Sequence, residues 1–251
     1  MNSFINWIGG KHQLKNEICN RMPDDFKRYI EVFGGAGWVL FNKPRHAALE
    51  VYNDANGDLV NLFRIVKFHT PELQRELEYS LNSREQFEDY KSQIITRGQT
   101  DIQRAARFFM LIKTSYGSSC RTYGCAKKSV ENMVSYLSEV KSRLSNVVIE
   151  NKDFENLIKV YDRPDALLYL DPPYFGTENY YNAEFPQQDH IRLNDVLTNI
   201  KGRFILSYND CDYIRQLYKN FKIDSVERTN NLVARYADKV NIYRELIIKN
   251  Y

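Results

Sequence analysis

Short apolar runs alternate with amphipathic segments along most of the chain. Residues 29–33 form a β-branched and aromatic run that ends in a glycine cluster at 34–37, which predicts a strand and a tight turn. The apolar residues 38–41 predict the start of a helix, and 47–52 predict a second strand. Apolar side chains at the i, i+3, i+4, i+7 spacing across 59–66 predict an amphipathic helix. The chain therefore begins in the order strand, helix, strand, helix.

The stretch from residue 70 to about 144 has a different character. It is rich in Glu, Gln and Arg, follows helical spacing and contains no convincing buried strand. Pro71 and Ser83 are typical of helix N-termini, and a turn-rich loop spans 115–124. This pattern predicts several helices in succession.

Strands and helices alternate again after this stretch. Strands are predicted at 147–149, 166–170 and 203–207, with a short helix at 153–160. Residues 166–170 are apolar at every position, as expected of a parallel strand that is covered on both faces. A last strand at 243–249 alternates apolar and polar residues in the manner of an edge hairpin.

These elements predict an α/β fold with a doubly wound sheet. Residues 1–68 and 135–251 would form the sheet domain, and 69–134 a helical insertion into it. A length of 251 residues suits one domain with an insertion better than two full domains. With 43% hydrophobic and 27% charged residues, the composition is that of a globular protein and excludes a disordered or coiled-coil chain.

No secretion signal or membrane span is expected, because no apolar stretch approaches the roughly 18 residues that a membrane helix needs. The four cysteines are expected to be free thiols in a reducing cytoplasm, since a chain of this size needs no disulfide. Cys120 and Cys125 lack a matching Cys or His pair, so no metal site is expected.

Positive charge is concentrated in the predicted insertion. The net charge is only +3, which excludes a histone-like polycation. Between residues 97 and 128, however, seven basic residues accompany one acid, so this stretch carries +6 and the other 219 residues carry −3. Such a run can simply be solvated. Its position beside a loop rich in Ser, Thr and Tyr favours a surface that follows a phosphate backbone.

The clearest chemical motif is Asp171-Pro172-Pro173-Tyr174, directly after the apolar strand at 166–170. Two prolines cannot continue a central strand, so the motif should lie at the carboxyl edge of the sheet, where α/β proteins bind ligands. The Asp171 carboxylate and the Pro172 carbonyl could accept both hydrogens of an exocyclic amine. The Tyr174 ring could stack on the base that carries the amine. A plain strand-ending turn is the structural alternative.

Two other segments have the composition of a cofactor site. The glycine turn at 34–37 would allow a ligand to approach the backbone, although Leu40 stands where a dinucleotide fingerprint requires Gly or Ala. Asp54 ends the second strand and is placed to bind ribose hydroxyls. Near the N-terminus, Trp7 could pack on an adenine and Lys11 could meet a carboxylate.

Taken in order, these segments resemble the Dam-type (D12 class) family of site-specific DNA adenine N6-methyltransferases. The order is Trp-x-Gly-Gly-Lys, Glu-x-Phe-x-Gly-x-Gly, Asn53-Asp54, an insertion, and Asp-Pro-Pro-Tyr. Asp153-Phe154, Ser207-Tyr208-Asn209-Asp210 and residues 235–245 also match, so the resemblance covers nearly the whole chain. It implies a Rossmann-like methyltransferase sheet in which the insertion is the target-recognition domain.

The resemblance also implies a role for each matching residue. Those that would bind S-adenosylmethionine are Trp7, Lys11, Glu31, Phe33, Gly35, Gly37, Asp54, Asp153, Phe154 and Asp171. The catalytic residues would be Asp171, Pro172, Pro173 and Tyr174. Contacts to double-stranded DNA would come from Lys113, Tyr116, Ser118, Arg121, Tyr123, Lys127 and Lys128. The expected protein is a bacterial or phage-encoded cytoplasmic monomer without a metal.

One departure bears on specificity. Family members that read GATC tend to carry Asn-Gly before a Leu-Cys-Arg segment in this loop. Here Cys120-Arg121 is kept, but Gly117 and Ser118 precede it in place of Asn-Gly. This difference argues against GATC as the recognition site.

The implied reaction transfers a methyl group from S-adenosylmethionine to N6 of an adenine that has left the DNA stack. Asp171 and the Pro172 carbonyl would polarise the amine where positive charge develops. Two alternatives stay open at this point: the same chemistry on RNA or on a small amine, and a non-catalytic DNA-binding protein of the same fold. A nicotinamide-dependent dehydrogenase is disfavoured by Leu40.

Overall fold

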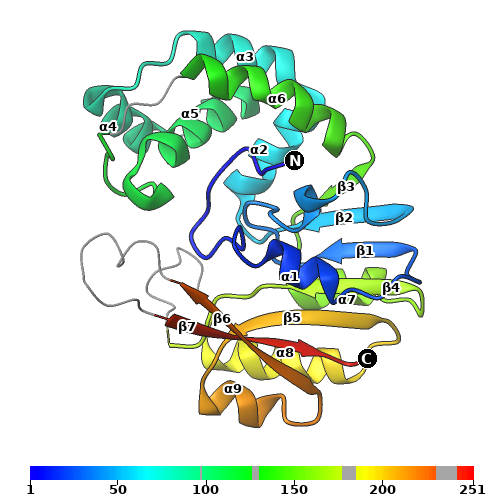
Figure 1. Ribbon diagram of the computed structural model, residues 1–251. Coiled ribbons are helices and arrows are strands. Elements are labelled where there is room, and N and C mark those ends of the chain that lie inside the picture. The colour runs from blue at the N-terminus through cyan, green and yellow to red at the C-terminus, as the bar shows by residue number, and fades with distance from the viewer. Residues whose placement is uncertain (97, 126–129, 177–184, 230–241) are drawn as a thin grey trace.

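The computed structural model describes residues 1–96, 98–125, 130–176, 185–229 and 242–251. In these residues, one seven-stranded sheet has the order β3-β2-β1-β4-β5-β7-β6 (Figure 1). The first five strands are parallel, and β7 runs antiparallel to both β5 and β6. The strands are β1 Arg28–Glu31, β2 Leu49–Asn53, β3 Val147–Glu150, β4 Ala166–Leu170, β5 Arg203–Asn209, β6 Lys222–Thr229 and β7 Ile242–Lys249.

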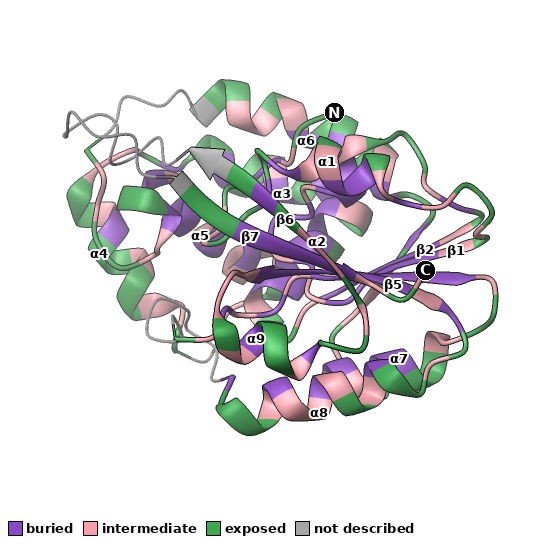
Figure 2. Cartoon of the chain, turned by 60° about the horizontal axis from the view of Figure 1, so that its bottom comes forward, coloured by how far each residue is buried: buried purple, intermediate pink, exposed green. Residues whose placement is uncertain are grey.

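Helices cover both faces of this sheet. The helices in the described residues are α1 Lys15–Asn20, α2 Gly57–Phe68, α3 Thr70–Glu78, α4 Arg84–Gln93, α5 Asp101–Thr114, α6 Val130–Leu144, α7 Phe154–Tyr161, α8 Gln187–Thr198 and α9 Asp212–Leu217. Figure 2 shows α7, α8 and α9 below the buried strands, with α1 and α2 on the other side. The predicted doubly wound α/β fold is therefore confirmed.

Successive side chains of a strand point to opposite faces of the sheet, and each face has its own hydrophobic core. Tyr29 and Tyr169 pack in the cluster that includes α1 and α2, whereas Ile30 and Leu168 pack in the cluster that includes α7, α8 and α9. All five side chains of β4 are buried, as the apolar run predicted. Each buried leucine of β4 contributes roughly 1.5–3 kcal/mol when it leaves water, so β4 stabilises the packing of both layers.

Helices α3, α4, α5 and α6 form a lobe beside the sheet (Figure 1). The helices have clear local causes: Thr100 and Gln103 make a reciprocal capping box at the start of α5, for example. Leu73, Phe109 and Leu137 belong to the same buried cluster as the α2 face of the sheet. The lobe thus extends that core, and the proposed boundary at residue 134 falls inside α6.

One expectation about secondary structure was wrong. Residues 38–41 do not start an α-helix; a 3₁₀ turn spans Leu40–Asn42 and ends where Lys43 becomes extended. Pro44 follows, and a residue that precedes proline is disfavoured in the helical region. The last predicted strand does belong to an antiparallel hairpin at the edge of the sheet, and it is the inner strand of that hairpin, because β7 lies between β5 and β6. The edge strand β6 went unpredicted because its mixture of polar and apolar residues has no clear period.

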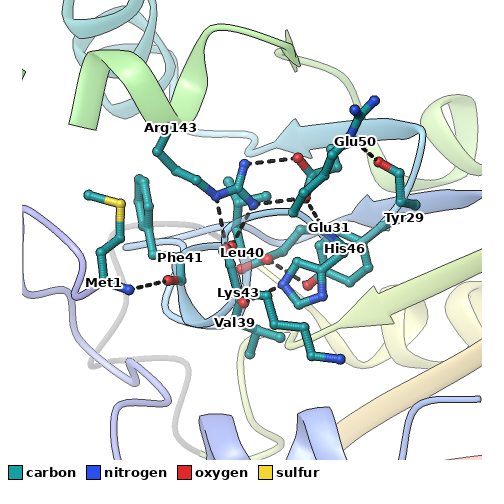
Figure 3. A network of polar contacts seen from close by, with 12 residues as sticks. Met1, Tyr29, Glu31, Val39, Leu40, Phe41, Lys43, His46, Glu50 and Arg143 are labelled. Carbon is teal, nitrogen blue, oxygen red and sulfur yellow. Dashed lines mark hydrogen bonds and ion pairs between the residues drawn. The ribbon is translucent and has the colours of Figure 1, made fainter. Parts of the chain in front are cut away.

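A buried polar network joins the end of α6 to the loop after β1 (Figure 3). Arg143 donates to both carboxylate oxygens of Glu50, at 2.8 and 2.7 Å, and to the carbonyls of Leu40 and Lys43. The side chains of Arg143 and Glu50 are only 5% and 2% exposed. Glu50 also accepts the backbone N–H of His46, so the bidentate pair fixes the loop to the lobe.

The described helices include none that is long and apolar enough to cross a membrane. The described residues likewise contain no group of three or more His, Cys, Asp or Glu side chains that could hold a metal ion.

Candidate active site

The carboxyl ends of the parallel strands enclose a cavity of about 200 Å³. It lies where the strand order reverses between β1 and β4, which is the usual ligand position in an open α/β sheet. Among the predicted cofactor residues, those that line it are Trp7, Lys11, Glu31, Phe33, Gly35, Asp54, Asp153, Phe154 and Asp171. Gly37 does not line the cavity. Of the motif after β4, Asp171 and Pro173 reach the cavity wall.

Asp171 is held by side chains from distant parts of the chain. Lys11 Nζ lies 2.6 Å from its Oδ1 and 2.8 Å from its Oδ2, and Ser207 Oγ donates to Oδ1 at 2.9 Å. Burial raises the pKa of Asp171, and the Lys11 cation opposes that rise. Lys11 therefore favours the ionised carboxylate, the form that can accept hydrogen bonds from an amine.

Tyr174 is more enclosed than a freely presented stacking platform. Its side chain is 9% exposed, and its hydroxyl donates to Glu245 Oε2 at 2.6 Å. Lys11 Nζ lies 4.6 Å from the centre of the Tyr174 ring, which is a cation–π distance. The sequence alone assigned a role to the ring only, whereas the structure gives the hydroxyl a charged partner as well.

The glycine turn forms part of the cavity wall through Gly34, Gly35 and Ala36. Gly35 has φ +49° and Gly37 has φ +68°, a region that side chains rarely adopt, so Gly37 shapes the turn without lining the cavity. A Cβ at Gly34 would overlap the ring of Tyr52. Asp54 accepts the N–H of Gly35 at 2.9 Å, so its carboxylate is fixed at the cavity wall. Burial raises the pKa of Asp54, and its backbone hydrogen bonds oppose that rise.

Three phenylalanine rings form an apolar wall. The centres of the Phe33 and Phe154 rings are 5.6 Å apart, and the Phe185 ring lies 5.7 and 5.8 Å from them. Asp153 caps α7 through Glu155 N–H, and its other oxygen accepts Arg192 Nη2 at 2.8 Å. The Arg192 guanidinium also lies 4.3 Å from the centre of the Phe154 ring, so it fixes both members of the predicted Asp-Phe pair.

Glu31 is a buried acid at the base of the cavity. It accepts the Tyr29 hydroxyl at 2.7 Å, and burial raises the pKa of Glu31 to about 8. Most molecules therefore carry a proton on Glu31 at neutral pH. The Tyr29 ring stacks on His46, and burial lowers the pKa of that imidazole to about 4, so this neighbour is neutral.

The loop after α5 contains most of the predicted DNA contacts. Tyr116 is 68% exposed, and Arg121 is also exposed. Ser118, in contrast, is buried, and Tyr123 is half-buried with its hydroxyl donating to Asn82, so both side chains contribute to the structure of the loop. Lys113 is half-buried and lies over the ring of Phe109. Of the predicted DNA contacts that the structure describes, Tyr116 and Arg121 are the exposed ones. Lys127 and Lys128 lie outside the described residues, as does most of the match at 235–245.

Three residues of this site received no role from the sequence. Phe185 lies just before α8, Arg192 lies on α8, and Glu245 lies on β7. Each reaches the site by a tertiary contact, and only Glu245 belongs to a segment that the sequence had matched, 235–245. Only the helical spacing around α8 could have suggested which of its faces meets the sheet.

The arrangement suits transfer of a group to an amine. The cavity combines a carboxyl group paired with Lys11 at Asp171, a fixed carboxyl group at Asp54 and an apolar wall at Phe33 and Phe154. Such acceptors stabilise the positive charge that develops on an attacking amine.

Comparisons with known proteins agree with this chemistry. The model of the family described as D12 class N6 adenine-specific DNA methyltransferase matches residues 7–232. The type II methyltransferase M1.LlaDCHI of Lactococcus lactis subsp. cremoris is 28% identical over 99% of this chain and 95% of its own length. A DNA adenine methylase of Serratia marcescens is 30% identical over 95% of this chain and 96% of its own length.

A third relative, from a virus, matches over the full length of both chains. The type II methyltransferase M.CviBI of Paramecium bursaria Chlorella virus NC1A is 23% identical, and the match covers 100% of both chains. The family model spans the N-terminal lysine, the glycine turn, the lobe and the Asp-Pro-Pro-Tyr motif. Lys11, the glycine turn and Asp171 line the same cavity. The chain therefore belongs to the D12 class N6 adenine-specific DNA methyltransferase family.

Proposed function

We propose that this chain transfers a methyl group from S-adenosylmethionine to N6 of an adenine in a specific duplex DNA sequence. The observation that carries the proposal is the position of Asp171, a carboxylate at the end of β4 that Lys11 holds at the wall of the cavity. Once a base is flipped out of the duplex, its N6 hydrogens could be accepted by Asp171 and by the Pro172 carbonyl. Catalysis would then rest on alignment and on stabilisation of charge.

The donor set of the cavity fits S-adenosylmethionine. Asp54 is fixed by the N–H groups of Gly35 and Asn56, and its remaining lone pairs suit ribose hydroxyls. Phe33 and Phe154 offer apolar rings to an adenine, and the acidic side chains suit a cationic sulfonium. When bound, this cofactor supplies an electrophilic methyl group.

The helical lobe is proposed to recognise the DNA. It places Tyr116 and Arg121 on an exposed loop, while the ring of Trp7 from the cavity wall packs against Phe108 of α5 at 5.9 Å. The lobe and the cavity are thus in direct contact. DNA held by the lobe would lie beside the mouth of the cavity, as base flipping requires.

Replacement of Asp54 by alanine should weaken S-adenosylmethionine binding by about 10- to 100-fold, as expected for the loss of hydrogen bonds to a charged group. Titration calorimetry measures this change directly. Asp165, at the amino end of β4 and away from the cavity, provides the control, and Asp165→Ala should keep the wild-type affinity. Equal affinities for Asp54→Ala and wild type would remove Asp54 from the cofactor site.

Replacement of Arg121 by alanine should cost about 1–3 kcal/mol of DNA binding and relax the preference at one base position, because arginine reads guanine with two hydrogen bonds. Binding to a panel of single-base variants of the target site measures both effects. Arg163 is exposed near the amino end of β4, and Arg163→Ala should change neither. A uniform loss across the panel, with a salt slope shallower by about one, would make Arg121 a phosphate contact instead.

The target sequence is open to direct measurement. Sequencing that detects N6-methyladenine, on DNA from cells that express the chain, should show methylation within one recurrent motif. The absence of Asn-Gly from the 116–121 loop predicts a motif other than GATC. Expression that leaves every adenine unmodified would contradict the proposed function.

A further inference from the structure

We infer that Glu245 is a positioning residue of the catalytic motif, which fixes the Tyr174 ring through its hydroxyl and sets the charge around Lys11 and Asp171. Because Tyr174 meets a flipped base only if the chain methylates DNA as proposed, the role of Glu245 rests on that function.

Two contacts of Glu245 share one carboxylate oxygen. Its Oε2 accepts the Tyr174 hydroxyl at 2.6 Å and lies 3.9 Å from Lys11 Nζ. Lys11 in turn lies 4.6 Å from the centre of the Tyr174 ring and within 2.8 Å of both Asp171 oxygens. Lysine, tyrosine and the two acids therefore form one cluster, in which each side chain limits the position of the others.

The position of Glu245 in the core is unfavourable for a carboxylate without a specific partner. It is 2% exposed, and it lies on β7 between β5 and β6, followed by the buried residues Leu246, Ile247 and Ile248. Burial of a carboxylate in such a strand is costly unless it is hydrogen-bonded and paired. An apolar residue would suit the core better. The partners that compensate Glu245 include Tyr174 and Lys11, both at the active site.

A hydroxyl bond to a fixed acceptor restricts the rotation of the Tyr174 ring. The ring follows two prolines, which already restrict the backbone, and Glu245 then holds its far end. A preoriented ring would meet the flipped base without losing further conformational freedom. A phenylalanine at this position would keep the stacking face, but it would lose that restraint and remove a donor from a buried carboxylate.

Glu245 also acts on Asp171 through charge. The pKa of Asp171 is raised first by burial and further by the Glu245 charge, and Lys11 lowers it. The titratable groups that face this cluster are Lys11 from the N-terminal segment, Glu31 at the end of β1, Tyr169 of β4, Tyr174, Tyr208 of β5 and Glu245 of β7. Asp171 must be ionised to accept the amine, so activity should fall as the pH drops through its pKa. Loss of the Glu245 charge would lower the pKa of Asp171. The acid limb of the pH profile, where activity falls as the pH drops, would then move to lower pH.

The test compares Glu245→Gln, Tyr174→Phe and the double variant with wild type, on a DNA duplex that carries the methylation site found by sequencing. Tyr174→Phe should lower kcat/KM by about 10- to 100-fold, and Glu245→Gln by about tenfold, since glutamine keeps only a neutral acceptor. The double variant should lose no more than Tyr174→Phe alone, because the two residues act through one bond. The acid limb of kcat/KM should move to lower pH in Glu245→Gln.

Glu50→Gln is the matched control, since Glu50 is an equally buried glutamate that pairs outside the cavity. Glu50→Gln should lower the melting temperature but leave the acid limb of the kcat/KM profile at its wild-type pH. Multiplicative losses in the double variant, or full activity in Tyr174→Phe, would overturn the role of Glu245. If Glu245→Gln fails to fold, the kcat/KM of Tyr174→Phe still tests the positioning role of Glu245. A wild-type protein that does not methylate DNA would overturn the proposed function, whereas an active wild type with an unaffected Tyr174→Phe would overturn this inference alone.

Discussion

Replacement of Asp171 by alanine is expected to abolish methyl transfer and to leave the protein folded. The carboxylate is the proposed acceptor of the amine hydrogens, and its loss should remove at least about 2.7–4 kcal/mol of transition-state stabilisation, as the loss of one preorganised polar group does elsewhere. Asp171 follows β4 and is not part of the apolar run, so the core should persist. The measurement is kcat from incorporation of labelled methyl groups, with the melting temperature as a check of folding.

The variant Asp171→Asn is a second test of the same residue. Asparagine keeps the shape of the side chain, but its amide offers one acceptor and leaves Lys11 without its closest anion. A loss comparable to that of alanine is expected. Asp165→Asn, at the opposite end of β4, should keep wild-type kcat. Near-normal turnover in either Asp171 variant would remove this residue from the mechanism.

Replacement of Arg143 by alanine is expected to destabilise the fold by about 3–5 kcal/mol, because it leaves the Glu50 carboxylate buried without its cation. The same change removes the donor for the carbonyls of Leu40 and Lys43. Since a domain is usually stable by only about 5–15 kcal/mol, this variant should approach the limit of folding. Urea denaturation followed by circular dichroism measures the loss.

An exposed arginine of the same lobe provides the control for Arg143. Arg75 on α3 is exposed, and Arg75→Ala should change the free energy of unfolding by less than about 0.5 kcal/mol. Arg143→Lys keeps the charge but loses the bidentate geometry, so an intermediate loss is expected. An Arg143→Ala variant as stable as wild type would show that the Arg143–Glu50 network does not hold the lobe to the loop after β1.

Features with a local cause could be predicted from the sequence. The apolar residues of β4 require burial on both faces, and the two prolines after it require an exit from the sheet, which together located Asp171 at the carboxyl edge. The spacing from residue 59 to 66 predicted α2, which spans Gly57–Phe68. The glycine turn was predicted by composition, although the overlap that a Cβ at Gly34 would have with Tyr52 depends on a second strand.

Features that depend on distant partners could not be predicted in this way. Tyr174 and Glu245 are 71 residues apart, and no periodicity connects a hydroxyl in a loop with a carboxylate on β7. Arg143 resembles any other basic residue near the end of a helix until Glu50, 93 residues away, is seen beside it. Ser118 and Tyr123 are polar residues in a basic loop, yet burial and a bond to Asn82 turn them inward. Such pairings arise only when the strands are assembled.

The central claim is that the product is N6-methyladenine in DNA and that Asp171 is required for it. Purified protein would be incubated with S-adenosylmethionine that carries an isotopically labelled methyl group and with duplex DNA, and the digested nucleosides would be separated by mass. Labelled N6-methyldeoxyadenosine is predicted with wild type and with Asp165→Asn, and none with Asp171→Ala. Label on cytosine, label only on a matched RNA duplex, or equal label with Asp171→Ala would contradict the account.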